Sequence, residues 1–594
     1  GVLRKVVSSF TDEVNSNTGV FTSNNTIVKT MNALRIRDYN NNRTDQAYAG
    51  GWVTTRPMNE GEFPDWGNPI AEIMYETLRY FAGKSAATTA FATSGGVDGH
   101  IGLPVATWDD PYSALSSAKA PWCARPNMLV VSGVNPSFDS DQLPGSAFDS
   151  FSGDLSGLNV QTEANTITAG EPSIPGMRFI GQVGSNYDGA PTAKSVSSIG
   201  NIRGLAPEEP TKRGSYYSAS VARFGKINDL RSDLTGRQSV DSFVVALSSP
   251  LPKIEVPVGG RKVTLVPFAK SVGGSGISNA KGDFQPTNQI VDFYVDTIVN
   301  SSNLDSNPAI NGGRYFARFR INFEDVEQGA DHDMDAIVVY EVAVESNGSV
   351  RVKLTPEYQA GGIYHSMGYI ISGTTKDGVY LVVRDESAAP SYYLNVPDGR
   401  DPGYCDASPM PASCGTLPYT ANPVQSSERF FSAGNTSASL LKDPLWYAAK
   451  WGGFTDRNGN NTPDLPLEWD GDGDGVPDTY FLVQNPLKLK EALKKSFDSI
   501  VERSASAGNI TSNGQEIRGG DRVFQSSFNS ATWDGELVAK SSSSIDQILW
   551  RASEKVPTPA NRKIYTWKTG TPAGSEFQWT SIGTTLQRSE EHTS

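Results

Sequence analysis

The hydrophobic pattern changes twice along the chain, and this change constrains the fold more than any other feature. Residues 1–252 contain both helical and strand-like apolar patterns. Residues 253–435 alternate between apolar and polar side chains, which is typical of strands with one buried face. The helical pattern returns at residues 436–505. The sequence therefore predicts a multidomain protein of α/β plus all-β class, in which an α/β domain is interrupted by a large β-rich insertion.

The first segment carries the patterns of a layered α/β domain. Between Asn68 and Gly83, apolar residues recur three and four positions apart, which predicts a helix. Asn68 can cap the start of this helix, and Gly83 suits its end. Residues 127–133 and 241–249 are short apolar runs, typical of buried parallel strands.

Residues 436–505 again show the helical and strand-like apolar patterns of the first segment. A strand is expected at 479–483, and a helix with an apolar stripe is expected at 486–503. The simplest interpretation is that strand 479–483 joins the sheet that holds residues 241–249. In that case 1–252 and 436–505 share one core.

The remaining segments are expected to be rich in strands or to lie outside the fold. Residues 253–435 hold several alternating runs and few helix signals, which predicts a β-sandwich. Residues 519–587 contain short strands and are expected to open a further β domain. Residues 588–594 resemble a translated sequencing-library adapter, the alternative being an ordinary polar tail, and we exclude them from the fold prediction. The chain opens directly into a strand-like run, so its start is interpreted as a truncation.

The most specific chemical feature is a pair of Asp- and Asn-rich loops that stand fourteen residues apart. Each places oxygen-bearing side chains at positions 1, 3, 5 and 9. In a turning loop, alternate side chains converge, and clustered carboxylates repel one another unless a cation holds them. All-oxygen, flexible ligands favour calcium over magnesium. The predicted ligands are Asp470, Asp472, Asp474, the backbone carbonyl of Val476, Asp478, and in the earlier loop Asp456, Asn458, Asn460 and Asp464.

This pattern departs from the standard EF-hand loop. Phe481 stands at position 12, where an EF-hand carries a bidentate Glu. The paired loops are more similar to dockerin or thrombospondin-type calcium repeats. The alternative interpretation is a solvated acidic turn that binds no ion.

Other candidate sites are weaker. Asp331, Asp333 and Asp335 surround His332, and we favour a solvated strand entry there over a metal site. His365 has no neighbouring nucleophile or metal-ligand partner in the sequence and is interpreted as a packed or surface histidine. The hydrolase and nucleotide motifs GxSxG, HExxH and GxxxxGK[ST] do not occur. We therefore do not expect an enzyme, although a carboxylate pair leaves a secreted hydrolase as an alternative.

Cysteines and charge indicate the compartment and exclude some partners. Cys405 and Cys414 bracket a Pro- and Ser-containing loop that a disulfide would fix, the alternative being two free thiols, and Cys123 is left without a partner. The net charge of −14 repels phosphate backbones, so nucleic acid is not an expected partner. No run of about 20 apolar residues occurs, so no transmembrane segment is expected.

Several unusual strings resemble one known family. WGNPIAEIMYETLRYFAG (66–83), NPSFDSDQLPG (135–145), the string from Phe179 to Ala222, and MGYIISGTTKDGVYLVVRD (367–385) are similar to PilC/PilY-type type IV pilus tip proteins. The resemblance extends over nearly the whole chain to about residue 587. It implies a calcium-binding pilus biogenesis factor and tip-associated adhesin, located outside the cell at the pilus tip or outer membrane. The implied partners are minor pilins and a host or abiotic surface.

The resemblance also implies a domain order. Residues 1–252 and 436–505 would form a von Willebrand factor A-like domain, 253–435 its β-rich insertion, and 519–587 the first strands of a C-terminal β-propeller. Such domains normally carry a metal-dependent adhesion site. This sequence departs from that site, as Asn68 stands where a Thr is expected, Gly133 stands where Asp is usual, and Asp139 and Asp141 are close but not equivalent. We therefore assign no adhesion site. A calcium-dependent carbohydrate- or protein-binding surface module unrelated to pili remains the alternative function.

Overall fold

The computed structural model divides the chain into two compact units. The larger unit contains residues 1–455 and 462–499, and the smaller contains 456–461 and 500–594. Each unit is described by itself below. The structure describes residues 5–6, 8–24, 26–33, 67–92, 105–112, 124–187, 189–248, 252–274, 277, 285–324, 334–359, 362–384, 409, 411–412, 427–504, 511–512, 522–529, 534–541, 544–558, 561–567, 574–578 and 580–581.

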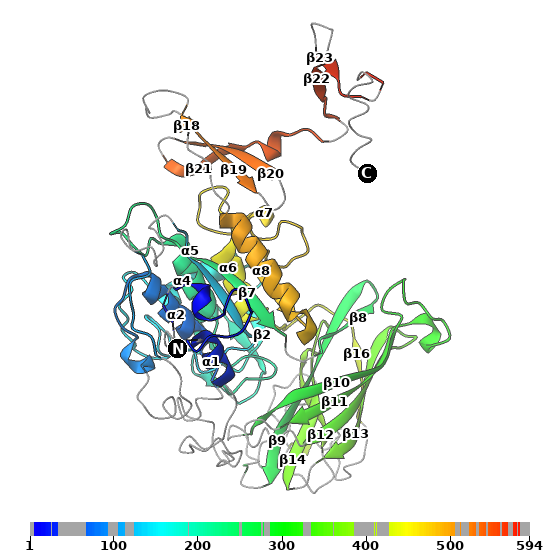
Figure 1. Cartoon of the computed structure of the whole chain (residues 1–594). Helices are drawn as coiled ribbons and strands as arrows, with labels where there is room; N and C mark the ends of the chain where they lie inside the picture. The colour runs from blue at the N-terminus through cyan, green and yellow to red at the C-terminus, as the bar shows by residue number, and fades with distance from the viewer. Residues whose placement is uncertain are drawn as a thin grey trace. The chain divides into compact units, whose positions relative to one another are not determined.

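A three-stranded parallel sheet lies at the centre of the α/β part of the larger unit. Its order is β1 (Asn127–Gly133), β7 (Asp241–Leu247) and β17 (Tyr480–Val483). β7 pairs in parallel with both neighbours, and Val245 lies opposite both Val131 and Phe481. The expectation that strand 479–483 joins the sheet of residues 241–249 is therefore confirmed. Figure 1 shows β7 among the helices of the α/β part.

Helices pack together beside this sheet and form the main core with it. They are α2 (Ile70–Phe81), α4 (Val160–Gly170), α5 (Tyr217–Ile227) and α6 (Pro444–Gly453). α5 contacts the other three helices. The approach of α6 is close because Gly452 has no side chain: a Cβ there would lie 2.7 Å from the Cβ of Ala222 and 2.8 Å from that of Ser242.

The boundaries of α2 confirm one predicted cap and correct the other. Gly83 follows the helix with φ +74°, as expected for a helix-ending glycine. The residue at the N-cap is Pro69, so the predicted capping by Asn68 is wrong. The Asn68 amide instead donates to Ser132 Oγ at 3.0 Å and to the Asn135 carbonyl at 3.1 Å. A long-range contact at the end of β1 therefore replaces the local cap.

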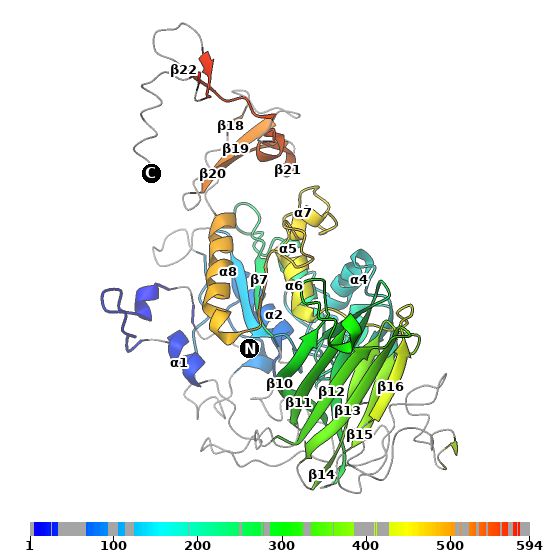
Figure 2. The same ribbon diagram turned by 90° about the vertical axis from the view of Figure 1, so that its right-hand side faces the viewer.

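The described residues between 254 and 432 form one nine-stranded antiparallel sheet. Its order is β15-β14-β9-β10-β11-β12-β13-β16, with β8 paired to β9, and Figure 2 shows β10 to β13 side by side. A bridge between Thr374 and Ala433 brings the β14–β15 connection against the residue after β16, so the sheet is nearly closed. The predicted β-rich insertion is confirmed as a strand-rich region. The strands are β8 (Ile254–Val258), β9 (Arg261–Gly274), β10 (Thr287–Val299), β11 (Phe316–Glu324), β12 (Ala336–Val344), β13 (Ser349–Gln359), β14 (Ile363–Ser372), β15 (Gly378–Arg384) and β16 (Ser427–Ser432).

The nine-stranded sheet packs against the α/β part through a small apolar cluster. Phe179 and Ala190 of the α/β part join Val266 and Phe268 of β9 and Ile370 of β14. All five side chains are buried.

The larger unit also contains shorter α-helices and strands, and α8 continues into the smaller unit. They are α1 (Thr26–Ala33), β2 (Gly176–Phe179), β3 (Gln182–Val183), β4 (Asn186–Tyr187), β5 (Ala193–Val196), β6 (Ile202–Arg203), α7 (Pro466–Trp469) and α8 (Leu489–Ser504).

The smaller unit is built from short antiparallel strands. β18 (Thr511–Ser512), β19 (Arg522–Asn529), β20 (Asp534–Ser541) and β21 (Ser544–Arg551) form a four-stranded sheet. The strands expected after residue 519 are therefore present. A separate two-stranded sheet consists of β22 (Tyr565–Trp567) and β23 (Gly574–Glu576).

Within the described ranges of both units, no helix has the length and apolar character needed to cross a membrane.

Candidate metal centre

The loop that follows α7 carries the second Asp-rich sequence and leads directly into β17. Trp469, which precedes the loop, and Val476, within it, both pack against the α/β core. Thr479 closes the loop with a buried side chain that donates from Oγ1 to the Ala449 carbonyl at 3.0 Å. The loop is therefore anchored to the core at both ends, whereas residues 471–475 and Asp478 are exposed.

Three carboxylates gather in this loop. Asp470, Asp472 and Asp474 each place one carboxylate oxygen within 4.8 Å of the others. Asp470 is buried, and the other two are exposed. Calcium ligands lie at about 2.3–2.6 Å from the ion, so oxygens on one ion are separated by up to about 5 Å. The spacing therefore fits a single calcium ion, whose charge would offset the mutual repulsion of the carboxylates.

The backbone of the loop turns around the Asp470 carboxylate. Its Oδ1 accepts the amide hydrogens of Gly473 at 2.8 Å and Asp474 at 3.0 Å, and its Oδ2 accepts that of Gly475 at 2.9 Å. Gly473 and Gly475 have φ of +78° and +81°, a left-handed conformation that favours glycine. These two glycines let the chain curl tightly enough to bring alternate side chains together.

The other two predicted ligands of this loop, Asp478 and the Val476 carbonyl, stay predictions, and both residues take part in hydrogen bonds within the loop. Asp478 lies outside the group of three carboxylates, and its Oδ1 accepts the Gly471 amide at 3.0 Å. The Val476 amide donates to Asp474 Oδ1 at 2.7 Å. An ion would therefore compete with backbone amides for the oxygens of Asp470 and Asp474, and the loop would adjust locally on binding.

The earlier loop repeats the same backbone pattern. Asp456 Oδ1 accepts the amides of Gly459 at 2.7 Å and Asn460 at 3.3 Å, and its Oδ2 accepts that of Asn461 at 2.9 Å. Gly459 and Asn461 have φ of +79° and +58°. The fourteen-residue sequence repeat is thus also a structural repeat. In addition, Asn458 Oδ1 accepts the Asn460 amide at 3.1 Å, and Asp464 is exposed in the larger unit.

Sequence analysis compared Asp139 only with the adhesion site and did not predict that its carboxyl, in the loop after β1, is buried and connects two helices. Asp139 Oδ1 accepts the Ser215 amide, just before α5, at 2.7 Å. Its Oδ2 accepts the Ala71 amide, in the first turn of α2, at 3.4 Å. Complete burial raises the pKa of Asp139 to about 7. Burial also raises the pKa of Asp141 above its usual range.

The weaker candidates fall partly outside the described residues. Asp331, His332 and Asp333 lie outside them, and Asp335 is buried, with its amide donating to the Phe323 carbonyl at 3.0 Å. His365 is fully buried on β14, which confirms the interpretation of a packed histidine. The predicted Cys405–Cys414 disulfide, together with Cys123 and residues 588–594, also lies outside the described residues.

These features define a class of protein. Its α/β domain carries an Asp-rich loop that is a candidate cation site, and a large antiparallel sheet is inserted in the sequence between two strands of the domain's own sheet. Residues 1–225 match the family described as PilY1 homolog, second domain, and residues 256–418 match the family described as PilY1 homolog, beta-sandwich. The chain belongs to the PilY1-type proteins. This agrees with the PilC/PilY resemblance carried by its sequence strings.

Two curated relatives, both from Xylella fastidiosa (strain Temecula1), are named "Type IV pilus biogenesis factor PilY1 homolog". The first is 42% identical over a 613-residue alignment, which covers 95% of this chain and 40% of the relative. The second is 28% identical over 120 residues, covering 18% of this chain and 10% of the relative. The chain therefore spans less than half the length of either relative. No solved structure matches the chain.

Proposed function

We propose that this chain is part of a type IV pilus biogenesis factor that is also a tip-associated adhesin. The alignment at 42% identity with a protein of that printed name, over 95% of this chain, carries the proposal. The protein acts outside the cell or at the cell envelope, binds minor pilins, and contacts a host or abiotic surface. Its role is assembly and attachment, without catalysis.

Within this role, the loop at 470–478 binds calcium and acts as a structural lock. The loop is anchored on the core by Trp469 and Val476 and leads into β17, which completes the parallel sheet. An ion that fixes the loop therefore also fixes the last strand of that sheet. The same proposal assigns residues 1–252 and 436–505 to a von Willebrand factor A-like domain with 253–435 inserted. It assigns 519–587 to the start of a β-propeller.

The pilus role is tested in a strain that lacks the full-length gene. Complementation with the unmodified gene is expected to restore surface pili and capture of purified minor pilins in pull-down with calcium. The Asp472→Asn, Asp474→Asn variant is expected to restore fewer pili. Asp498→Asn is the matched control, because Asp498 is an exposed carboxylate of α8, ion-paired to Lys494 and outside the loop.

Two results would contradict different parts of the proposal. Absence of any pilus defect in the deletion strain, with no pilin capture by the full-length protein, would remove the pilus role. Normal pili with the loop variant would remove only the requirement for calcium in assembly.

A further inference from the structure

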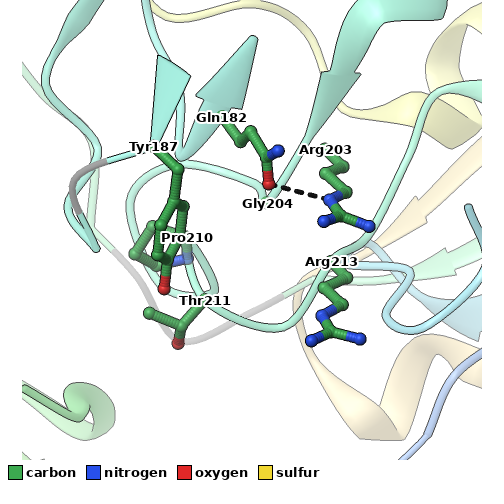
Figure 3. Close-up of a pocket in the computed structure, with 7 residues that line it drawn as sticks. All are labelled: Gln182, Tyr187, Arg203, Gly204, Pro210, Thr211 and Arg213. Atoms are coloured by element: carbon green, nitrogen blue, oxygen red, sulfur yellow. Dashed lines mark hydrogen bonds between the residues drawn. The ribbon is translucent and has the colours of Figure 1, made fainter. Parts of the chain in front are cut away.

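A pocket lies beside the small sheet β4-β3-β6 of the larger unit. Figure 3 shows the side chains that line it, and Arg203 Nε donates to Gln182 Oε1 at 2.8 Å. Its volume is about 220 Å³. The side chains of Tyr187, Arg203, Thr211 and Arg213 belong to residues that already interact within the protein, so we assign this pocket no ligand.

The connection between β10 and β11 presents a leucine to solvent. This loop begins at residue 300, after the end of β10, and Leu304 lies within it. The Leu304 side chain is 99% exposed, more than any other large apolar side chain in the described part of the chain. Single exposed leucines are common on protein surfaces, so exposure alone does not indicate a function. The hydrogen bonds of the loop supply the second observation.

Asp305, the residue after Leu304, holds the backbone on the other side of the leucine. Its Oδ2 accepts the Ser301 amide at 2.8 Å and the Ser301 hydroxyl at 2.7 Å. Its Oδ1 accepts the Ser302 amide at 2.7 Å and the Ser302 hydroxyl at 3.2 Å. The Leu304 amide donates to Ser302 Oγ at 3.2 Å. Leu304 therefore lies inside a compact turn that is closed by side-chain hydrogen bonds.

Two asparagines fix the base of the loop. Asn300 Oδ1 accepts the Asn307 amide at 2.6 Å, and Asn300 Nδ2 donates to the Arg314 carbonyl at 3.0 Å. Asn311 Nδ2 donates to the carbonyl of Val344, the last residue of β12, at 3.0 Å. Asn300 and Asn311 have φ of +59° and +49°, a region that asparagine adopts more readily than most residues. The loop is therefore preorganised and joined to the neighbouring strand.

The surroundings of Leu304 exclude several classes of ligand. The other exposed side chains of residues 301–309 are serine, asparagine, proline and alanine. Asp305 is the only charged residue among them, and the hydrogen bonds from Ser301 and Ser302 hold the pKa of its carboxyl well below its usual range. A segment with one carboxylate and no cation does not attract a phosphate backbone or an anionic membrane surface.

A preorganised apolar side chain with a neutral polar border matches an apolar pocket on a protein. Association costs free energy when loops and side chains must be ordered, and a loop that is already fixed avoids part of this cost. Removing the leucine side chain from water is favourable. Protein interfaces commonly surround such an apolar centre with a polar rim.

We propose that this loop binds a minor pilin, with Leu304 in an apolar pocket of the pilin and the serines and asparagines of the loop at the rim. The inference rests on the proposed pilus role and names the surface that carries it out. An abiotic surface offers no such pocket, whereas a folded pilin subunit can. The loop is part of the nine-stranded sheet and is separate in sequence from the Asp-rich loops.

The test is the affinity of the full-length protein for purified minor pilins, measured by biolayer interferometry with calcium present. Leu304→Ser is expected to weaken binding roughly ten- to a hundredfold, because it removes the burial of a leucine side chain. Leu304→Met keeps an apolar side chain of similar volume and should retain most of the affinity. Leu487→Ser is the matched control, because Leu487 is a leucine of the same unit that is 86% exposed and lies outside the loop.

A second variant tests the preorganisation of the loop. Asp305→Ala removes the acceptor of the bonds from Ser301 and Ser302 but leaves Leu304 in place. It is expected to weaken pilin binding severalfold, and less than Leu304→Ser does. Asp498→Ala is the control, because it removes an exposed carboxylate outside the loop.

Circular dichroism and melting of each variant distinguish weaker binding from misfolding. Leu304→Ser changes a side chain that is fully exposed, so its melting temperature should equal that of the unmodified protein. If Asp305→Ala fails to fold, Leu304→Ser decides the result.

Three results would overturn the inference, and they are distinguishable. Absence of binding between the unmodified full-length protein and every minor pilin would contradict the pilus role and the inference together. Equal pilin binding by Leu304→Ser and the unmodified protein would overturn the loop assignment alone. Loss of surface attachment by Leu304→Ser, with pilin binding unchanged, would assign the loop to the surface and not to a pilin.

Discussion

Lys270 Nζ, on β9 of the nine-stranded sheet, donates to the backbone carbonyl of Gly189 at 2.5 Å. The Lys270 side chain is fully buried, and Gly189 belongs to the α/β part of the larger unit. A buried ammonium is unfavourable unless hydrogen bonds replace its hydration. This bond therefore links the two parts of the larger unit at the place where Phe179 and Ala190 pack against β9.

Replacing this lysine is expected to weaken the link. Lys270→Met keeps an apolar stem of similar length but leaves a buried carbonyl without the ammonium, a change that costs about 1–3 kcal/mol. The measurement is the free energy of unfolding in urea. Lys262→Met is the matched control, because Lys262 lies on the same strand and is exposed. Equal loss of stability in the two variants would contradict the linking role.

Calcium is expected to stabilise the folded chain through the loop at 470–478. An ion that binds only the folded state stabilises it by about 2.7 kcal/mol at a hundredfold excess over its Kd. Chelation should therefore lower the melting temperature and make this loop the first site of proteolysis. Asp472→Ala with Asp474→Ala should abolish the calcium response, whereas Asp498→Ala should retain it. Unchanged melting and proteolysis of the unmodified chain on calcium titration would contradict the lock.

Asp139 is expected to contribute a pH dependence between about pH 4 and 7. Burial raises its pKa from 3.8 to about 7 in the folded state, so the folded state binds this proton more tightly than the unfolded state. Its contribution to stability is therefore full below about pH 4 and is lost as the pH rises through about 7. One proton gives a slope of at most about 1.4 kcal/mol per pH unit.

The measurement for Asp139 is the free energy of unfolding in urea from pH 4 to 8. Asp139→Asn should flatten the decline of stability with rising pH. Asp443 serves as a comparison, because burial raises its pKa to about 6. Asp443→Asn should therefore flatten the decline of stability over a pH range that ends near pH 6. An identical pH profile in Asp139→Asn and the unmodified chain would rule out this contribution.

Gly452→Ala is expected to separate α6 from α5 and β7. The added methyl group would meet the Cβ of Ala222 at 2.7 Å and that of Ser242 at 2.8 Å, closer than real Cβ contacts. Overpacking of this kind costs about 1–3 kcal/mol. Gly133→Ala is the control, since a Cβ there meets nothing within 4 Å. Equal melting temperatures for the two variants would show that the helices relax without penalty.

Features that depend on nearby residues were predicted well from the sequence. The apolar runs within 127–133 and 241–249 correctly predicted the adjacent parallel strands β1 and β7. The central strand β7 is buried on both faces, whereas β1 alternates and leaves Val131 exposed. The tight turn of the 470–478 loop could also be predicted, since the Asp and Gly residues that form its hydrogen bonds are only a few positions apart. In both cases the determining contacts are short in sequence or follow from composition alone.

Features that depend on distant contacts were not predictable in the same way. Asn68 has the residue type of a helix cap, but Ser132 and the Asn135 carbonyl compete for its amide once the chain has folded. Gln182 and Arg203 lie on strands of two residues each, which are too short to produce a periodic pattern. Their pairing therefore depends on long-range register.

The position of β17 beside β7 also sets an order of events during folding. The parallel sheet receives its third strand only after the ribosome has synthesised the whole nine-stranded sheet between them. Until then the β17 edge of β7 lacks a partner, and unpaired strand edges are prone to aggregation. A collapsed insertion brings its two ends together and shortens the loop that must close. Folding of the nine-stranded sheet therefore shortens the time for which this edge of β7 stays unpaired once β17 has been made.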